Sequence, residues 1–449
     1  MRGLTVGLIL LAICLAAATA RVGPFMVGGL GRSADLGFAT SEQARLTVRI
    51  VAPGSPAEKA GLKVGDEILA INGRAIGRPY EGSAMLQRLK GRETVSLAVS
   101  RADRELAVSF TPPPRPLESY PEVDVEYGSM RTSDGVMLRT LVSRPRDASA
   151  GSRLPTLFFT QWVSCGSIET IRPGREQVAD MMRRSGWALI RVERAGAGDS
   201  EGPACHELDY DTELRHYREA LATLSKHRWV DAARIVIWGS SLGSTTAPLL
   251  AEGFSVAGLI VQGGGALTYA ERMIAFDRLG LERSGKSAAE IDRGMRKSIL
   301  FNADYLYGRR TPEQILRDRP ELAGVWQSMR GTGDGVHYGR PYAYHWQAAE
   351  KDFLTAWSRI EAPVLVLYGE YDQFEPEHGH KLIVDMLNRL RPGSASYVAI
   401  PQAGHDLEIF ATPEDAAAGE TGVAVPRLFL EPVLKLLARL PAKRPSAVQ

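Results

Sequence analysis

The chain has 449 residues, of which 44% are hydrophobic and 24% are charged, as in ordinary soluble globular proteins. Its length predicts two or three domains. The formal net charge of +2 is close to zero for this size, so the composition gives no indication of a nucleic-acid partner or of binding to an anionic membrane surface.

The first 20 residues have the layout of a secretory signal peptide. Arg2 supplies a positive charge, residues 8–15 form a short apolar run, and Ala18-Thr19-Ala20 is a small-x-small cleavage site. An uncleaved membrane anchor is the alternative, but the apolar run is shorter than the ~20 residues that a spanning helix needs. We therefore expect a periplasmic or secreted protein with no membrane span beyond this signal.

Residues 24–112 have the pattern of a small mixed α+β domain. Ser55 is expected to cap a short helix that has Pro56 at its first position and ends at Gly61. Asn72-Gly73 is a tight-turn signal between strands. The other expected elements are strands over residues 46–51, 68–71 and 95–100 and a helix over residues 83–89.

The run from Gly54 to Arg74 resembles the central motif of a PDZ domain of the bacterial type found in exported proteases. Leu36-Gly37-Phe38 is similar to the loop in that family whose backbone N–H groups receive a peptide carboxylate. The resemblance implies a peptide ligand. The alternative is a spacer that packs on the catalytic domain and binds nothing.

A proline-rich linker separates this domain from the rest of the chain. Thr111-Pro112-Pro113-Pro114-Arg115-Pro116 cannot continue a helix or a strand, and it predicts a stiff extended segment over residues 113–121. The second domain is expected over residues 122–440. Residues 441–449 are expected to form a flexible tail.

Strands and helices alternate in the second domain, which predicts an α/β fold with a mostly parallel sheet covered by helices on both faces. The clearest helices are expected at 177–184 and 213–226. No strand pattern occurs between about residues 266 and 344, and this insertion is expected to form a helical cap over the active site. The expected strands cover residues 137–142, 156–160, 187–192, 235–238, 257–261, 363–367 and 396–400.

The strongest chemical signal is Gly239-Ser240-Ser241-Leu242-Gly243, which follows the apolar residues 235–238 and precedes a helix. A Gly-x-Ser-x-Gly turn between a strand and a helix pushes the central serine out from the end of the sheet. Ser241 is therefore the predicted nucleophile, and Ser240 stands in the wrong register.

A serine hydroxyl needs a base to accept its proton, and an acid to orient that base. Asp372 follows the expected strand 363–367, and His405 follows the expected strand 396–400, in the chain order Ser, Asp, His. We expect His405 to act as the base and Asp372 to fix its tautomer. The rivals are Glu370 and Glu375 for the acid, and His378 and His380 for the base.

The oxyanion of the reaction needs two backbone donors. One is expected to be the Leu242 N–H, directly after the nucleophile. The other is expected in the loop after residues 156–160, where Trp162 N–H is favoured and Val163 N–H is the alternative.

With these motifs, residues 122–440 resemble an α/β-hydrolase of the serine aminopeptidase and esterase group. Glu193–Gly202 is similar to the Arg-x-Gly-x-Gly-x-Ser loop of that family, and Val230–Ile235 is similar to the approach to its nucleophile strand. The resemblance implies the fold and the catalytic triad, and it leaves the substrate open.

Two cysteines remain if the signal, with Cys14, is removed: Cys165 and Cys205. In an exported protein two thiols can pair, so a Cys165–Cys205 disulfide is predicted, with two separate buried thiols as the alternative. In the resembled fold their loops follow neighbouring strands, so a bridge would hold the oxyanion loop.

The leading functional reading is a carboxylic-ester hydrolase that works through an acyl-enzyme on a small ester. The rival is an aminopeptidase-like serine peptidase, acting on short peptides whose ends the PDZ-like domain binds. A non-catalytic binding protein is the third reading. In the cap, three acidic side chains could meet a free amine or be solvated: Glu271, Asp277 and Glu282.

No cofactor and no metal are expected. His378 and His380 are interpreted as an exposed helix start rather than as metal ligands, because two ligands alone do not make a zinc site.

Overall fold

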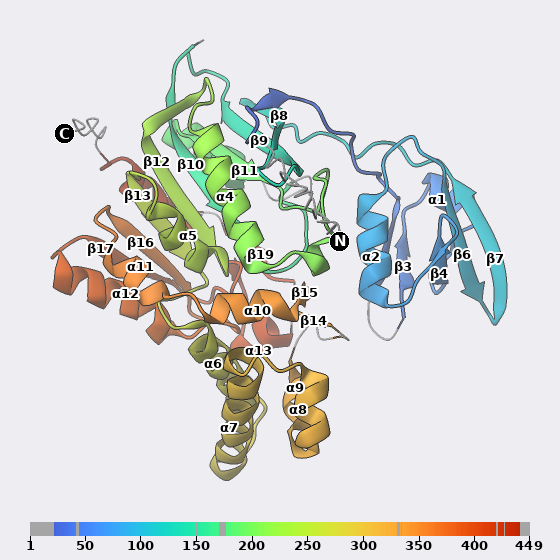
Figure 1. Cartoon of the computed structure of the whole chain (residues 1–449). Coiled ribbons are helices and arrows are strands. Elements are labelled where there is room, and N and C mark those ends of the chain that lie inside the picture. Colours follow the sequence, from blue (N-terminus) through green and yellow to red (C-terminus); the bar gives the residue numbers. More distant parts are fainter. Residues whose placement is uncertain are drawn as a thin grey trace, which may run out of the picture.

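The computed structural model places two domains side by side (Figure 1). The predicted signal peptide and the C-terminal tail lie outside the described residues. Among the helices that are described, none is long and apolar enough to cross a membrane. The described residues are 22–41, 45–149, 151–169, 177–329, 333, 335–418, 421–425 and 427–440.

The small domain is an antiparallel sheet with two helices. Its core packs Val48, Ile68, Leu97 and Val99, each at most 2% exposed. The strands are, in sheet order, β2 (Phe38–Ser41), β3 (Thr47–Val51), β4 (Glu67–Ile71), β6 (Val95–Arg101) and β7 (Arg104–Phe110), with β5 (Arg74–Ala75) paired to β4. The helices are α1 (Pro56–Lys59) and α2 (Pro79–Arg88).

Local sequence signals account for the turns of this domain. The Ser55 side chain accepts a hydrogen bond from Glu58 N at 3.1 Å and so caps α1. Gly61 follows that helix with φ of +90°. Asn72 and Gly73 have φ of 49° and 77°, as a type I′ turn between β4 and β5 requires.

The large domain is built on a nine-stranded sheet. Strands β10, β11, β12, β13, β16 and β17 run parallel, as predicted, while β9 is antiparallel to β11 and β8 is antiparallel to β9. From one edge to the other the strands are β1 (Met26–Val27), β8 (Val123–Arg131), β9 (Met137–Pro145), β11 (Ala188–Val192), β10 (Leu154–Thr160), β12 (Val230–Ser240), β13 (Gly258–Gln262), β16 (Val364–Gly369) and β17 (Ala395–Ile400).

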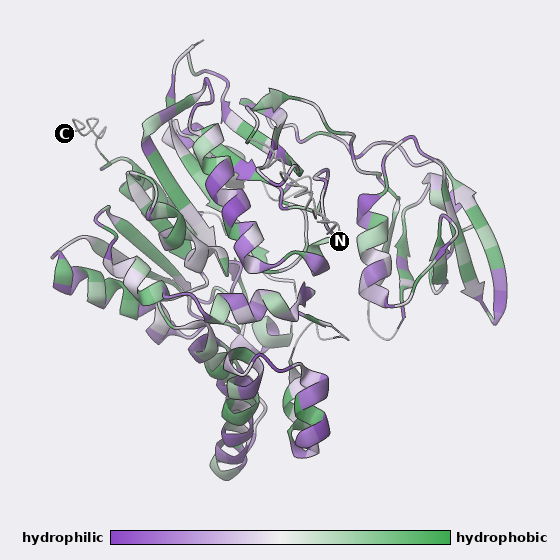
Figure 2. Cartoon of the chain, in the orientation of Figure 1, coloured by the Kyte–Doolittle hydropathy of each residue, from purple (hydrophilic) through white to green (hydrophobic). Residues whose placement is uncertain are grey.

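Helices cover both faces of this sheet, and each face has its own apolar core. The central strands are mostly hydrophobic because both of their faces are buried (Figure 2). One face carries α4 (Tyr210–Leu224), α5 (Gly243–Ala251), α11 (Phe353–Ser358) and α12 (Glu377–Leu390), and the other carries α3 (Gln177–Ser185) and α14 (Arg427–Leu437).

The insertion after β13 forms a helical cap that projects from the large domain (Figure 1). A hairpin of two short strands also lies in it, which the sequence prediction missed because two-residue strands carry no periodicity. The cap contains α6 (Tyr269–Arg283), α7 (Ala288–Asn302), a π-helical turn (Ala303–Tyr307), α8 (Pro312–Asp318), a 3-10 turn (Pro320–Leu322), α9 (Ala323–Ser328), β14 (Val336–His337), β15 (Arg340–Pro341) and α10 (Tyr342–Ala349).

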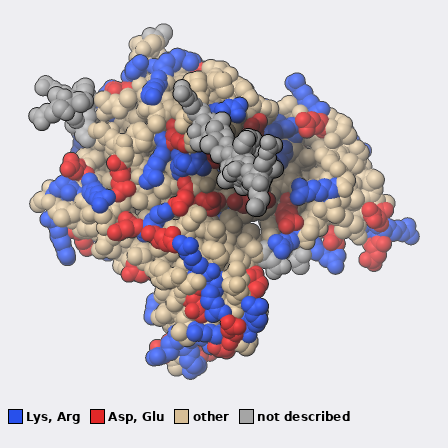
Figure 3. All heavy atoms as spheres, viewed as in Figure 1, with Lys and Arg blue, Asp and Glu red and all other residues tan. Residues whose placement is uncertain are grey.

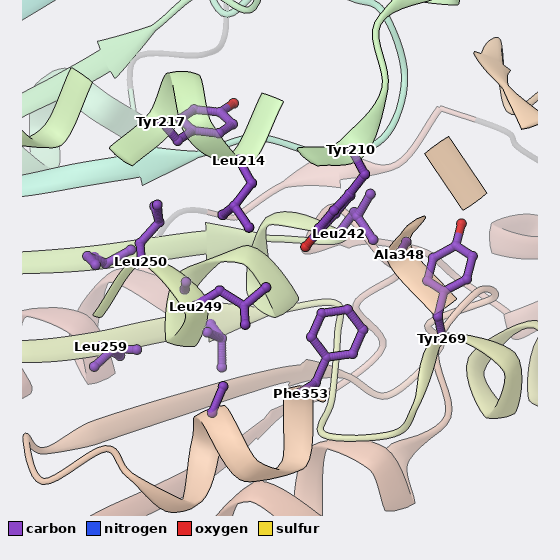
Figure 4. Packing of buried hydrophobic residues seen from close by; sticks show 14 of the residues in the cluster. Tyr210, Leu214, Tyr217, Leu242, Leu249, Leu250, Leu259, Tyr269, Ala348 and Phe353 are labelled. Atoms are coloured by element: carbon purple, nitrogen blue, oxygen red, sulfur yellow. The ribbon is translucent and has the colours of Figure 1, made fainter. Parts of the chain in front are cut away.

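The cap and the sheet share one core. Side chains from α4, α5, α6, α10 and α11 pack around the turn that carries Leu242 (Figure 4). They include Tyr210, Leu214, Leu249, Tyr269, Ala348 and Phe353.

The described part of the chain starts in the large domain before it enters the small one. Met26 and Val27 pair with Ser129 and Gly128 of β8. Only after this short strand does the chain form the small domain, and the linker then returns it to β8. The small domain is therefore inserted between the first two strands of the nine-stranded sheet, whereas the sequence boundary at residue 24 assigned β1 to the small domain.

A buried ion-pair cluster joins the two domains. Asp199 of the large domain accepts hydrogen bonds from Ser33 N at 2.7 Å and from Arg32 Nη1 at 2.5 Å. Arg139 Nε, only 2% exposed at its side chain, donates to the same carboxylate at 3.0 Å. Arg32 Nη1 also lies 2.5 Å from Glu169. The segment that leads into the small domain is therefore held against the large one.

Candidate active site

Ser241 stands on a sharp turn between β12 and α5. Its φ of 54° is in the left-handed region, which a non-glycine residue adopts only under strain. A Cβ on Gly239 would lie 2.4 Å from Gly243 O, and one on Gly243 would lie 2.2 Å from Thr160 O. Only glycine fits at these two flanking positions, which explains the Gly-x-Ser-x-Gly pattern.

The structure brings Ser241, Asp372 and His405 together. His405 Nε2 lies 2.8 Å from Ser241 Oγ, and His405 Nδ1 lies 2.9 Å and 3.0 Å from the two oxygens of Asp372. Asp372 is 1% exposed. The three side chains therefore form a continuous hydrogen-bonded chain from a buried carboxylate to a hydroxyl in the wall of a hollow.

Two parallel strands place the acid and the base. Asp372 follows β16, where its Oδ1 also accepts from Phe374 N at 2.8 Å and from Glu375 N at 2.9 Å. His405 follows β17, on a loop that approaches so closely that a Cβ on Gly369 would lie 2.3 Å from Gly404 O. The carboxyl ends of parallel strands meet at one edge of the sheet, where α/β folds hold their ligands.

The buried pair has opposed pKa shifts. Burial alone would lower the pKa of His405, but the Asp372 carboxylate outweighs burial and raises that pKa to about 9. Burial alone would raise the pKa of Asp372, but the charge and the hydrogen bond of His405 bring it below its ordinary value. The pair is thus arranged to stabilise an imidazolium.

The rival residues have other partners. Glu375 forms a two-point ion pair with Arg272, and Glu370 accepts from Gln402 N at 2.9 Å. His378 is exposed. His380 is fully buried, with Nε2 2.9 Å from Gly264 N and Nδ1 3.1 Å from Pro376 O. The interpretation of an exposed helix start is therefore wrong for His380, whose ring joins α12 to the loop after β13.

Three backbone N–H groups were predicted as candidate oxyanion donors, and all three belong to residues that line the same hollow as Ser241. Within the described residues neither Leu242 N–H nor Trp162 N–H donates a hydrogen bond, and the same holds for Val163 N–H. The structure therefore leaves these N–H groups unused at the place where the oxyanion donors were predicted.

Two neighbouring buried residues, Glu193 and Arg194, hold the loop that carries Trp162. Arg194 donates to the carbonyls of Trp162, Val163 and Ser164, the last two at 2.9 Å and 3.0 Å. Glu193 accepts from Ser167 Oγ at 2.6 Å and from Ile168 N at 3.0 Å. The sequence motif at residues 193–202 identified this segment. It did not predict that the first two residues of the segment hold the loop that carries Trp162.

Burial raises the pKa of Glu193 to about 7, although its hydrogen bonds with Ser167 and Ile168 oppose this shift. Its carboxyl group can therefore change charge near neutral pH while it holds the loop.

A disulfide fixes the same loop from another side. Cys165 of the loop is bonded to Cys205, with their Cα atoms 5.7 Å apart, in the pairing predicted from the sequence. Cys205 begins a 3-10 turn (Cys205–Glu207) after β11. The loop is thus tied covalently to the segment that follows Arg194.

The hollow beside Ser241 has a volume of about 540 Å³ and lies between the loop, the cap and the His405 segment. Helix α6 supplies one wall with residues spaced i, i+3, i+4 and i+7. The lining residues are Arg115, Trp162, Val163, Ser164, Gly166, Ser167, Glu169, Ser241, Leu242, Tyr269, Arg272, Met273, Phe276, Tyr338, Phe374, Glu375, His405 and Asp406.

None of the three acidic cap residues that could have met a free amine lines this hollow. Glu271 caps α6 through Thr268, and Glu282 pairs with Arg278 at the surface. Asp277 accepts from Ser298 and Asn302, and burial raises its pKa to about 6.

A second hollow of about 420 Å³ lies in the small domain between β2 and α2. Leu36 and Phe38 of the predicted carboxylate loop line it, together with Leu86 of α2. Gly37 has φ of +68°, and a Cβ there would lie 2.4 Å from Ser55 Cβ, so the loop requires glycine. The loop predicted to receive a peptide end therefore does border a groove.

Comparisons with known proteins agree with this architecture. A family model described as "PDZ domain" matches residues 47–101, and one described as "Alpha/beta hydrolase family" matches residues 175–419, which is more than half of the chain. Among curated proteins, a polyketide transferase of Stachybotrys chlorohalonatus is 31% identical over 121 residues, 27% of this chain and 37% of that protein. A probable periplasmic serine endoprotease of Marinomonas is 44% identical over 66 residues, 15% of this chain and 14% of that protein. The chain therefore spans well under half the length of either relative.

Solved structures of similar arrangement have low sequence identity. An alpha/beta hydrolase from Penicillium is 16% identical with a TM-score of 0.43, covering 71% of this chain and 99% of its own. A Pyrococcus furiosus esterase is 13% identical with a TM-score of 0.43, covering 73% and 97%. The Butyrivibrio proteoclasticus protein Est1E, solved with ferulic acid, is 17% identical with a TM-score of 0.43, covering 68% and 98%.

The family matches confirm the predicted fold of both domains. This chain belongs to the alpha/beta hydrolase family and carries a PDZ domain at the N-terminal side of its hydrolase domain.

Proposed function

We propose that this protein is an exported serine hydrolase that cleaves carboxylic esters through an acyl-enzyme. The observation that carries the proposal is the hydrogen-bonded series Asp372, His405, Ser241, with 2.8 Å between His405 Nε2 and Ser241 Oγ. The short apolar run near the N-terminus and the Cys165–Cys205 disulfide support export.

The proposed reaction starts when His405 Nε2 takes the proton of Ser241 Oγ, which attacks the ester carbonyl carbon. Negative charge moves to the carbonyl oxygen, where Leu242 N–H and Trp162 N–H would hold it. The imidazolium then gives its proton to the departing alcohol, and Asp372 stabilises the positive ring meanwhile. A water activated by His405 releases the acid and restores Ser241.

The walls of the hollow favour an ester over a peptide with a free amine. Four aromatic side chains supply an apolar lining: Trp162, Phe276, Tyr338 and Phe374. The buried carboxylate of Glu375 already pairs with Arg272, and that of Glu169 pairs with Arg32. Among the described residues of the wall, only the exposed Asp406 remains as a carboxylate that could meet an amine.

A serine peptidase is the second candidate, favoured by the groove between β2 and α2. A peptide could add to β2 as a further strand, which is a recurrent way to bind extended chains. Under this reading the groove would bring a peptide towards the hydrolase domain.

The decisive experiment compares kcat/KM for a short acyl ester and for an aminoacyl anilide, with Ser241→Ala as the control. Ester turnover that is abolished by the substitution, with negligible anilide cleavage, is the expected result. Efficient anilide cleavage would instead establish the peptidase.

A fluorophosphonate probe should label the wild type and not Ser241→Ala, and an unlabelled wild type would revive a non-catalytic role. The N-terminal sequence of exported protein tests the signal.

A further inference from the structure

The PDZ groove and the catalytic hollow share part of one wall. Arg115 and Ser167 line both. In the groove they adjoin the end that carries Ser33, Ala34 and Asp35, next to the carboxylate loop. A ligand that fills this end of the groove therefore reaches the rim of the hollow that contains Ser241.

The backbone of Arg115 is fixed at this junction. Arg115 N donates to Ser33 O at 2.7 Å, and Arg32 Nε donates to Arg115 O at 3.1 Å. Arg32 and Ser33 are in turn bonded to Asp199 of the hydrolase domain. The linker residue thus keeps its place between the two domains through the same buried cluster that joins them.

The guanidinium of Arg115, by contrast, has N–H groups that are available for a ligand. Its side chain is 34% exposed, and its nearest carboxylate oxygen, on Glu169, is 3.8 Å away. Arg32 already holds Glu169 with two hydrogen bonds, at 2.5 Å and 3.1 Å. Within the described residues the Arg115 side chain donates no hydrogen bond.

The ion-paired side chains at the junction carry one more positive than negative charge, and Lys90 and Asp35, which also lie there, add one charge of each sign. The ion-paired side chains are the guanidinium groups of Arg32, Arg115 and Arg139 and the carboxylates of Glu169 and Asp199. Of the three cations, Arg115 is the most exposed. Arg272, the other arginine in the hollow, pairs with Glu375 through Nε and Nη2, and its remaining Nη1 is buried. A guanidinium with free N–H groups binds carboxylates well, and often with two hydrogen bonds.

We propose that Arg115 is an anion anchor shared by the two hollows. It holds either the terminal carboxylate of a peptide in the PDZ groove or a carboxylate carried by an ester in the catalytic hollow. Both ligands would use the same guanidinium, because Arg115 lines both hollows, so the two ligands compete. The inference rests on the proposed ester hydrolysis. It adds a substrate class, namely esters that carry a carboxylate on the acyl chain. It also predicts that a peptide with a free C-terminus inhibits hydrolysis of that class selectively.

The test uses the purified full chain, two matched esters and two matched peptides. The esters are para-nitrophenyl hexanoate and the para-nitrophenyl monoester of adipic acid, which has the same chain length and a terminal carboxylate. The peptides share one sequence ending in leucine, one with a free carboxylate and one amidated. The variants are Arg115→Gln and, as the conservative form, Arg115→Lys.

We expect Arg115→Gln to lower kcat/KM for the adipate ester, relative to the hexanoate ester, by about tenfold, mainly through KM. The free-carboxylate peptide should raise KM for the adipate ester in the wild type, and the amidated peptide should not. Arg115→Lys should retain part of both effects. Direct calorimetry should show that Arg115→Gln weakens binding of the free-carboxylate peptide by about tenfold and leaves the amidated peptide little changed.

Three results would overturn the proposal: an unchanged ester ratio in Arg115→Gln, equal inhibition by both peptides, or equal inhibition of both esters. Failure of the proposed function can be distinguished from failure of this inference. If the proposed function fails, the wild type would hydrolyse neither ester faster than Ser241→Ala does. In that case the calorimetric comparison still decides whether Arg115 binds the peptide carboxylate.

Discussion

At the scale of single residues, the His405–Asp372 pair decides when Ser241 can act. His405 must be neutral to accept the serine proton, and Asp372 raises the pKa of His405 to about 9. We therefore expect kcat/KM for a neutral ester to rise with pH until about pH 9. Asp372→Asn removes the charge that raises this pKa, so the rise should move to lower pH while the maximal kcat falls by about 10⁴. Rate measurements from pH 5 to 10 on both proteins check this, and an unshifted profile would contradict it.

The same pair contributes to stability with a defined sign. The pKa of His405 is higher in the folded protein than the ordinary value of 6.5, so the folded state binds the proton more tightly. Its stabilising contribution is complete below about pH 6.5 and is lost as pH rises to about 9. The window of best catalysis is therefore the window in which this ion pair contributes least to folding.

At the scale of elements, the loop after β10 depends on the residues that follow β11. Arg194 binds three successive carbonyls of the loop, so we expect Arg194→Met to loosen the Trp162 donor and lower kcat by about ten- to hundredfold with little change in KM. Steady-state kinetics on an acyl ester measure the effects on kcat and on KM separately. Arg296→Gln, on the exposed face of α7, is the matched control. A change confined to KM would show that Arg194 shapes the substrate site instead.

Much of the fold and of the site could be read from local sequence. The turn at Ser241 is dictated by its own flanking glycines, and Asp372 and His405 each follow a strand that is apolar enough to recognise. The contacts of Arg194 and Glu193 with the loop were not predicted, because their partners lie about 30 residues earlier in the chain, as the hydrogen bonds to 162–168 show. His380 was misread because its burial arises from contact with Gly264, which is distant in sequence. Residues that act across such separations leave no periodic signal.

At the scale of the whole molecule, the junction between the domains is ionic and buried, while the surface seen in Figure 3 mixes charges of both signs. Asp199→Asn removes the charge that meets Arg32 and the buried Arg139, so we expect a loss of about 3–5 kcal/mol in unfolding free energy. Protease cleavage in the linker over residues 113–121 should also become faster. Chemical denaturation and limited proteolysis measure the two effects, with the more exposed Asp124→Asn as control. Unchanged cleavage would mean that other contacts suffice to hold the domains.

The short strand β1 has a practical consequence for any shortened form of the protein. Removing the PDZ domain by cutting the chain at the linker would also remove Met26 and Val27, the residues that pair with β8. The N–H and C=O groups of β8 near Gly128 and Ser129 would then be exposed at the sheet edge, and an open edge is a template for aggregation. Joining residue 30 directly to residue 116 keeps that edge covered. If the form cut at the linker loses solubility and the form joined from residue 30 to residue 116 does not, the cause is the exposed edge of the sheet. Such a result would carry no information about what the PDZ domain binds.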